Sequence, residues 1–160
     1  MTPGNFARTA FLLAALVAGG VAARAQSIQR NIYDANANAR ADIHYALLAA
    51  QRDHKRVILD FGGNWCGDCI VLNYYLHQPP NATLLARNFI LVDIDIGQYD
   101  HNLDIAHQYD IPLKLGVPAL AVLSPGGQLL YSQRHAEFEK MAHTDPSAVT
   151  AFLNRWKPAS

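Results

Sequence analysis

The sequence predicts an α/β domain in which helices cover both faces of a central β-sheet. Apolar runs of strand length alternate along the chain with segments of helical periodicity, an order typical of layered domains. The last two strand-like runs flank a turn signal, Ser124–Gly127, which indicates an antiparallel hairpin. One more helix follows the hairpin and completes the layers.

The first half of the domain begins with a helix and a buried strand. Residues 37–53 predict the helix, because four apolar side chains recur on one helical face. These are Ile43, Ala46, Leu47 and Ala50. Residues 56–61 form a continuous apolar run ending at Gly62–Gly63, which is typical of a central strand buried on both faces. A second helix is expected over residues 68–76, and Pro79–Pro80 ends it.

The remaining elements before the last helix alternate in type. We expect a short helix over 82–88, a strand over 89–94, a helix over 103–109, and the two hairpin strands over 119–123 and 128–132.

The final helix carries a clear start signal. Asp145 is a favoured N-cap residue and Pro146 a favoured first helical residue. The helix is expected to continue to about Lys157, with four apolar side chains on one face. These are Val149, Phe152, Leu153 and Trp156.

The composition is that of an ordinary globular protein. The chain has 160 residues, of which 51% are hydrophobic and 16% charged, and its formal net charge is +0. This length suits one domain with a substantial core. Because the basic residues form no polybasic footprint, nucleic acid is not an expected partner. We expect a monomer.

Residues 1–25 are typical of a signal peptide. Arg8 supplies a positive charge, residues 11–18 are the core of a short apolar stretch, and residues 23–25 (Ala-Arg-Ala) suit signal peptidase. The apolar stretch is shorter than the roughly 18 residues of a spanning helix. The alternatives are an uncleaved anchor and a buried helix. We expect a mature domain over 26–160 and a periplasmic or secreted location.

The two cysteines, Cys66 and Cys69, stand only three positions apart, which favours a chemical role over a structural one. Stabilisation by a disulfide grows with the length of the loop that it closes, and this ring is very small. Cys66 also follows a predicted buried strand and opens a helix, whose N-terminal N–H groups favour a thiolate. The thiolate is the nucleophile of disulfide exchange.

Other uses of such a pair are metal binding and haem attachment. A zinc site would need two more ligands, which only scattered His or Asp residues could supply. Haem attachment needs a histidine after the second cysteine, where Ile70 stands. Redox exchange is therefore favoured. The rival from another class is a metal or copper carrier that uses both cysteines and a histidine; a thiol peroxidase is a second enzymatic rival.

The segment VILDFGGNWCGDC, residues 57–69, resembles the strand and active-site loop of the thioredoxin family. The segment GVPA, residues 116–119, resembles the cis-proline loop of that family. The resemblance spans about residues 37–157 and implies a thioredoxin fold with a central mixed sheet. It also implies an exposed attacking thiol at Cys66, a buried resolving thiol at Cys69, and no bound cofactor.

Asp60 ends the apolar part of the first strand, where a carboxyl needs a partner. Desolvation would raise its pKa, which suits acid–base chemistry. In the thioredoxin family the acid at the matching position lies beneath the cysteine pair and helps proton transfer at the resolving thiol. Asp60 is therefore a candidate catalytic residue, the alternative being a bond to the Gly62–Gly63 turn.

Five residues around the cysteines are candidates for substrate binding. These are Trp65, Gly67, Asp68, Val117 and Pro118. The resemblance implies a cis peptide before Pro118, which would set the Val117 backbone beside Cys66 for strand-like pairing with a client peptide. Trp65 is expected to lie partly exposed over the sulfur. The alternatives are a simple strand-opening proline and a core tryptophan.

Two features depart from the common thioredoxin pattern. Asp68 stands where proline is most often found, and we expect its carboxylate to be exposed and to oppose a Cys66 thiolate. Residues 111–115 lengthen the approach to Pro118.

Residues 134–144 look like an insertion whose charges form a solvated face. Three histidines are also expected at the surface: His77, His101 and His107.

Together these features predict an exported thiol–disulfide oxidoreductase that reduces client proteins. Cys66 would attack a client disulfide, Cys69 would resolve the mixed disulfide, and Asp60 would move the proton. The expected partners are clients with disulfides or dithiols. Because cytosolic reductants are not expected outside the cytoplasm, a membrane partner would supply the electrons.

The mature protein should begin at Gln26, because Ala23 and Ala25 fit the signal peptidase. Intact-mass measurement of the exported protein checks this. A mass that still includes residues 1–25 would contradict it.

Overall fold

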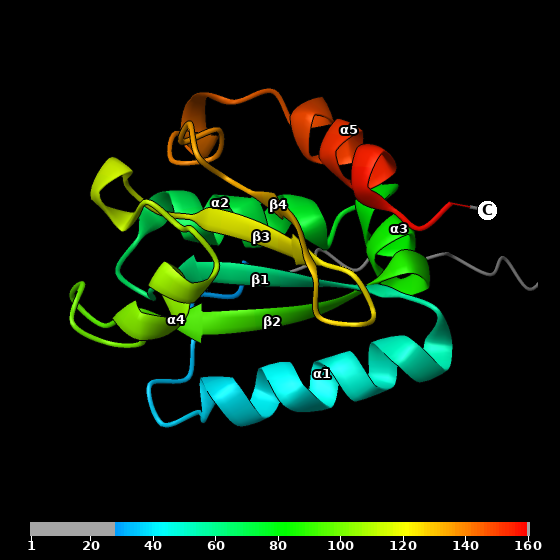
Figure 1. Ribbon diagram of the computed structural model, residues 1–160. Helices are drawn as coiled ribbons and strands as arrows, with labels where there is room; N and C mark the ends of the chain where they lie inside the picture. Colours follow the sequence, from blue (N-terminus) through cyan, green and yellow to red (C-terminus); the bar gives the residue numbers. More distant parts are fainter. Residues whose placement is uncertain (1–27, 160) are drawn as a thin grey trace, which may run out of the picture.

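A computed structural model describes residues 28–159, so the signal peptide predicted over residues 1–25 lies outside the described part (Figure 1). The elements are α1 (Ala39–Asp53), β1 (Arg56–Gly62), α2 (Gly67–Leu76), α3 (Asn81–Asn88), β2 (Phe89–Asp95), α4 (Leu103–Gln108), β3 (Ala119–Leu123), β4 (Leu129–Ser132) and α5 (Ser147–Trp156), with 3-10 helices at Leu113–Leu115 and Met141–His143. Within the described residues no helix is both long and apolar enough to cross a membrane.

The four strands form one mixed sheet in the order β2-β1-β3-β4. β1 pairs in parallel with β2 and antiparallel with β3, and β3 pairs antiparallel with β4. The predicted mixed sheet and the predicted hairpin are therefore confirmed. Because β1 has a partner on each edge, its backbone groups are paired within the sheet, which allows six of its seven residues to be buried.

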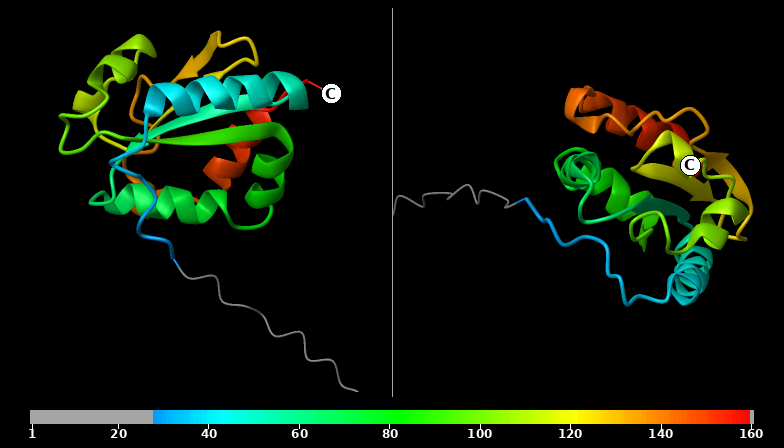
Figure 2. Two further views of the ribbon diagram at one scale, coloured as in Figure 1. Left: turned by 90° about the horizontal axis from the view of Figure 1, so that it is seen from below. Right: turned by 90° about the vertical axis from the view of Figure 1, so that its left-hand side faces the viewer.

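Helices cover both faces of the sheet, as predicted (Figure 2). One apolar cluster joins α1 and α4 to the sheet, and the other joins α2, α3 and α5 to the opposite face. Side chains alternate between the two clusters along β1: Leu59 and Phe61 belong to the first and Ile58 to the second. The same alternation places Asp60 on the α2 side.

Capping side chains explain where the first and last helices begin. α1 starts at Ala39, two residues later than predicted, because the side chain of Asn38 accepts a hydrogen bond from the Ala41 N–H at 3.1 Å. The Asp145 side chain accepts from the Ser147 N–H at 2.8 Å, as a capping side chain does, but α5 begins at Ser147, so Pro146 is the residue before the helix rather than its first residue.

Residues 134–144 are only partly the solvated face that the sequence predicts. His135, Glu137 and His143 are exposed, but Glu139 is half-buried. Phe138 and Met141 are buried in the cluster of α2 and α5. These two apolar anchors fix the segment over the end of α2 that carries the cysteines.

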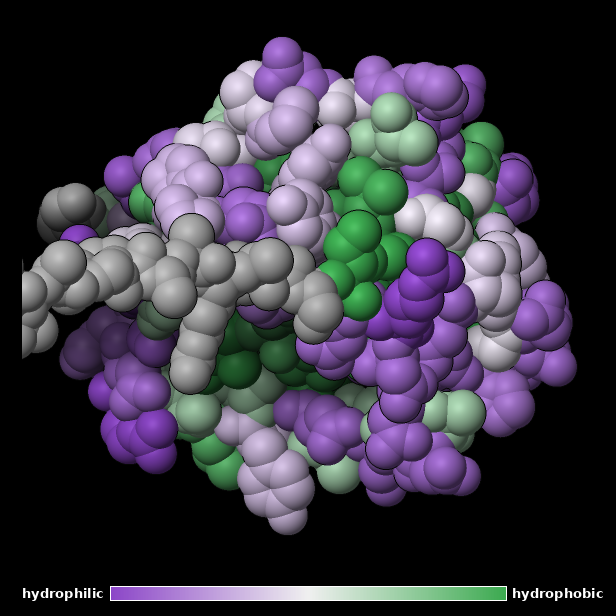
Figure 3. Space-filling view, turned by 180° about the vertical axis from the view of Figure 1, so that it is seen from behind, coloured by the Kyte–Doolittle hydropathy of each residue, from purple (hydrophilic) through white to green (hydrophobic). Residues whose placement is uncertain are grey.

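Seen from behind, the molecule shows hydrophobic side chains gathered near the middle of a hydrophilic surface (Figure 3).

Candidate active site

Cys66 and Cys69 form a disulfide at the N-terminus of α2, with their Cα atoms 5.3 Å apart. Cys66 is the N-cap residue, and its sulfur accepts a hydrogen bond from the Cys69 N–H at 3.1 Å. This donor and the helix dipole would stabilise negative charge on the Cys66 sulfur after reduction. Cys66 keeps 6% of its surface exposed and Cys69 none, so Cys66 is the sulfur that a partner can approach.

Strand β1 ends directly against the disulfide at Gly62. A Cβ placed on Gly62 would lie 2.8 Å from the Cys69 sulfur and still closer to the hydroxyl of Tyr33. No side chain fits this position, so glycine lets the strand, the sulfur and the hydroxyl come together.

Asp60 is fully buried, and its hydrogen-bond partner is Tyr33 rather than the Gly62–Gly63 turn. The Tyr33 hydroxyl donates to Oδ2 of Asp60 at 3.0 Å, while Oδ1 is buried without a partner among the described residues. Burial raises the pKa of Asp60 well above its usual range, and the charge of Asp93 raises it further. The hydrogen bond from Tyr33 acts in the opposite direction.

A second acid, Asp93, lies beside Asp60 and was not identified from the sequence. The parallel register of β1 and β2 pairs Asp60 with Asp93. Burial raises the pKa of Asp93 to about 6, against a smaller lowering effect of His77. Asp93 interrupts an apolar strand just as Asp60 does, which is a usable signal. Only the register, however, shows that the two acids are neighbours.

The Val117–Pro118 peptide is cis, and the Val117 carbonyl oxygen lies 3.5 Å from the Cys66 sulfur. Gln133, which is 1% exposed, fixes this loop from beneath. Its side chain donates to the Pro118 carbonyl at 3.0 Å and accepts from the Leu120 N–H at 3.1 Å. Backbone groups of Val117 are thereby held beside the disulfide, as the resemblance to the thioredoxin family implied.

Trp65 is 46% exposed, which excludes the alternative of a core tryptophan. Its indole N–H donates to the Gly97 carbonyl at 2.6 Å, and its ring packs at a tilt on Tyr99, with centroids 5.5 Å apart. Trp65 therefore joins the cysteine loop to the loop that follows β2.

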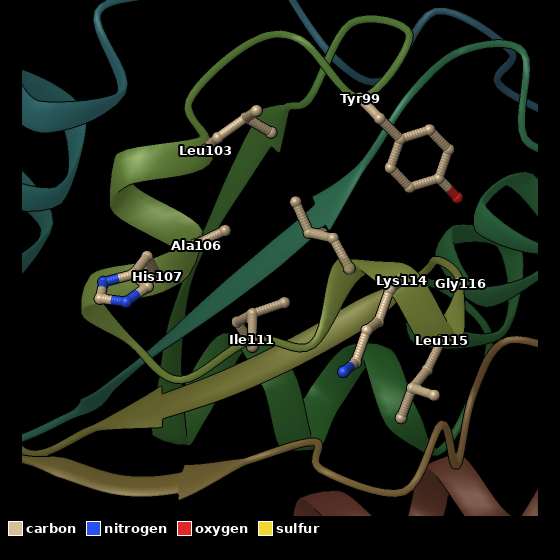
Figure 4. A pocket seen from close by; sticks show the side chains of 9 residues that line it. Tyr99, Leu103, Ala106, His107, Ile111, Lys114, Leu115 and Gly116 are labelled. Atoms are coloured by element: carbon tan, nitrogen blue, oxygen red, sulfur yellow. The ribbon is translucent and has the colours of Figure 1, made fainter.

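A groove of about 670 Å³ continues from this aromatic pair towards the proline loop (Figure 4). Its lining comes from the loop before α4, from α4 itself, and from the 3-10 helix that lengthens the approach to Pro118. The lining residues are Tyr99, Leu103, Ala106, His107, Ile111, Leu113, Lys114, Leu115 and Gly116. Tyr99, Leu103 and Leu115 each keep more than two fifths of their surface exposed, so the groove offers apolar surface to a partner.

Asp68 is half-buried rather than exposed as expected. Its carboxylate accepts a hydrogen bond from the Ala142 N–H at 2.8 Å, because residues 134–144 pack over the start of α2. The neighbouring Gly67 is exposed, and a Cβ placed there would meet nothing within 4 Å. The cysteine loop is therefore open at Gly67 and covered at Asp68.

The described residues show no group of three or more His, Cys, Asp or Glu side chains that could hold a metal ion. His77, His101 and His107 are all exposed, as the sequence predicts.

Comparison with known proteins adds the following similarities. Residues 38–125 match a family described as thioredoxin-like. A disulphide isomerase from Xylella fastidiosa Temecula1 is 33% identical, with a TM-score of 0.74 over 78% of this chain and 95% of that one. A thioredoxin from Thermus thermophilus is 19% identical, with a TM-score of 0.54 over 70% of this chain and 81% of that one. A comparison with curated proteins finds no match.

Asp93→Asn should stabilise the protein at neutral pH. Because burial raises the pKa of Asp93 from 3.8 to about 6, the unfolded chain loses this proton first as the pH rises, so stability falls across that interval. An amide removes this fall, and we expect a gain of about 1–3 kcal/mol at pH 7. Urea unfolding at acidic and neutral pH measures it. If the free energy of unfolding changes between the two pH values by the same amount in Asp93→Asn as in the wild type, the raised pKa of Asp93 is contradicted.

Proposed function

The chain belongs to the thioredoxin-like family, and we propose that it reduces disulfides in client proteins through the Cys66–Cys69 pair. One observation carries the proposal. The pair opens α2 with Cys66 outermost and beside the Val117 carbonyl, while Cys69 packs against Gly62, two residues after the buried Asp60 of the same strand. A structural disulfide needs none of these surroundings, whereas thiol exchange uses each of them.

The reaction moves two electrons from the reduced pair to the client. The Cys66 thiolate attacks one sulfur of the client disulfide, and the other client sulfur leaves as a thiolate that takes up a proton. Cys69 then loses its proton to Asp60, and its thiolate attacks the Cys66 sulfur of the mixed disulfide. The second client sulfur leaves, and the Cys66–Cys69 disulfide of this structure is the product.

Client recognition is proposed to combine backbone pairing with apolar contact. The Val117 backbone offers hydrogen-bonding groups next to Cys66, so an extended client segment can add there like a strand. The groove beyond Gly116 would receive apolar side chains of the same segment. Tyr99 lines the same groove, and Trp65 packs on Tyr99 and extends the apolar surface.

The proposed direction is reduction of the client. The Asp68 carboxylate is held in the first turn of α2 by its bond to the Ala142 N–H, so its negative charge stays near Cys66. That charge disfavours the Cys66 thiolate. Strong oxidants of this chemistry depend on a stabilised thiolate in the reduced form, so Asp68 favours the disulfide product and a reducing pair.

We further propose that the protein works outside the cytoplasm, as a periplasmic or secreted domain. The signal-like pattern of residues 1–25 supports this proposal. Reducing equivalents would then come from a membrane partner that delivers electrons across the membrane, since the glutathione pool is a cytosolic reductant.

Disulfide isomerisation is a second candidate function, because the 33% identical protein from Xylella fastidiosa Temecula1 is a disulphide isomerase. Isomerisation uses the same attack by Cys66 but lets the client resolve the mixed disulfide itself. Refolding of a scrambled four-disulfide substrate separates the functions. If the protein is an isomerase, its Cys69→Ser variant still restores the activity of the scrambled substrate. If it is a reductase, that variant stays bound to the substrate as a mixed disulfide.

Cys69→Ser should accumulate mixed disulfides with a client such as insulin, because Cys66 can attack while no second thiol releases it. We expect at least several-fold more trapped product than with Cys66→Ser, measured by intact mass under non-reducing conditions. The Cys66→Ser variant is the matched control, since it keeps one cysteine of the same pair. Equal trapping by both variants would contradict the assigned roles.

A further inference from the structure

A segment far from the cysteines in sequence completes the surroundings of the disulfide. The side chain of Asn64, two residues before Cys66, accepts hydrogen bonds from the backbone N–H groups of Ile32 and Tyr33 at 2.8 and 3.0 Å. It also donates to the Tyr33 carbonyl at 2.7 Å and to the Asn31 side chain at 3.0 Å. One loop residue therefore fixes the segment Asn31–Tyr33 against the active-site loop.

This attachment inserts the Tyr33 side chain into the core beneath the disulfide. Tyr33 is 1% exposed, and its hydroxyl donates to Oδ2 of Asp60 at 3.0 Å. The same hydroxyl and the Cys69 sulfur both approach Gly62 so closely that no Cβ could stand between them. The hydroxyl thus lies against both the Asp60 carboxyl and the strand residue that contacts Cys69.

The ionisable groups around Asp60 are mostly acids. Asp93 acts on Asp60 from β2, and Asp95 of the same strand acts on Tyr33. Cys69 of α2 lies against Gly62, and the exposed His77 acts on Asp93 from the end of the same helix. β3, on the other edge of β1, contributes only Ala, Leu and Val side chains. Burial and the charge of Asp60 raise the pKa of Tyr33 well above its usual range, so the phenol keeps its proton and remains a donor.

We propose that Tyr33 is a positioning residue for the resolving thiol, whose hydroxyl favours the carboxylate form of Asp60 and orients it to take the proton of Cys69. The proposal rests on the proposed dithiol chemistry. A carboxylate in this buried, acidic setting is unstable unless a donor compensates its charge, and the Tyr33 hydroxyl is that donor. Oδ1 of Asp60, which has no partner among the described residues, is then the free proton acceptor.

The step that Tyr33 supports is a proton transfer followed by thiol exchange. The Cys69 S–H bond breaks, and its proton passes to the Asp60 carboxylate while its electron pair stays on sulfur. The Cys69 thiolate then bonds to the Cys66 sulfur, and the client sulfur leaves with the electrons of the broken mixed disulfide. The Tyr33 proton remains on its own oxygen throughout.

Tyr33→Phe removes only the hydroxyl and tests the proposal. Loss of the donor should raise the pKa of Asp60, so less carboxylate is present at neutral pH and resolution becomes slower. We expect the pH profile for release of a preformed mixed disulfide to move upward by about one pH unit. In an Asp60→Asn background the same substitution should leave the profile unchanged.

Tyr109→Phe is the matched control, because it removes the hydroxyl of another buried tyrosine of the same apolar cluster. Its pH profile should coincide with that of the wild type. An upward shift of equal size in Tyr109→Phe, or a Tyr33→Phe profile that coincides with the wild type, would overturn the proposal. Thermal unfolding of both variants separates a loss of fold from a shifted profile.

A readout that needs no activity keeps this inference separate from the proposed function. In the oxidised protein, 13C NMR of labelled aspartate carboxyls follows the titration of Asp60, with Asp60→Asn assigning the signal. The apparent pKa of Asp60 should be higher in Tyr33→Phe than in the wild type. Equal values would overturn the role of Tyr33, whereas a protein that reduces no client but shows the shift would overturn only the proposed function.

Discussion

The pairing of β1 between β2 and β3 is the constraint on which the site depends. Because β1 is buried along nearly its whole length, the carboxyl of Asp60 has no access to water and must find its partners inside the protein. The parallel register supplies Asp93 as a neighbour, which makes ionisation harder, and the N-terminal segment supplies the Tyr33 hydroxyl, which makes it easier. The same strand ends at Gly62, whose missing side chain lets Cys69 approach.

The surface around Cys66 combines segments that are distant in sequence. The 3-10 helix at Leu113–Leu115 forms part of the groove on one side of the proline loop. On the other side, Ala142 binds the Asp68 carboxylate, and a Cβ on Gly116 would lie 3.2 Å from the Cβ of Glu139. The sequence indicates that both segments depart from the common thioredoxin pattern, and both border the proposed client surface.

Local sequence signals sufficed for the elements and for the chemistry of the cysteine loop. Apolar runs predicted the strands, Asp145 predicted a helix start, and the spacing of Cys66 and Cys69 indicated a redox pair. Tyr33 could not be found in this way, because it lies in a polar stretch without periodicity and acts through a contact 27 positions along the chain. The half-burial of Asp68 could not be predicted from the sequence, because it depends on how residues 134–144 pack over the start of α2. That packing is set by Phe138 and Met141, which are buried in the core of the folded chain.

The reduction potential of the Cys66–Cys69 couple tests the central claim most directly, because it measures whether this site favours the disulfide that the structure contains. Equilibration of the purified protein with glutathione or dithiothreitol buffers, followed by mass measurement of alkylated thiols, gives the value. A couple that donates electrons to clients should lie towards the roughly −270 mV of thioredoxin. A value near the roughly −120 mV of a strong oxidant such as DsbA would contradict the reducing role.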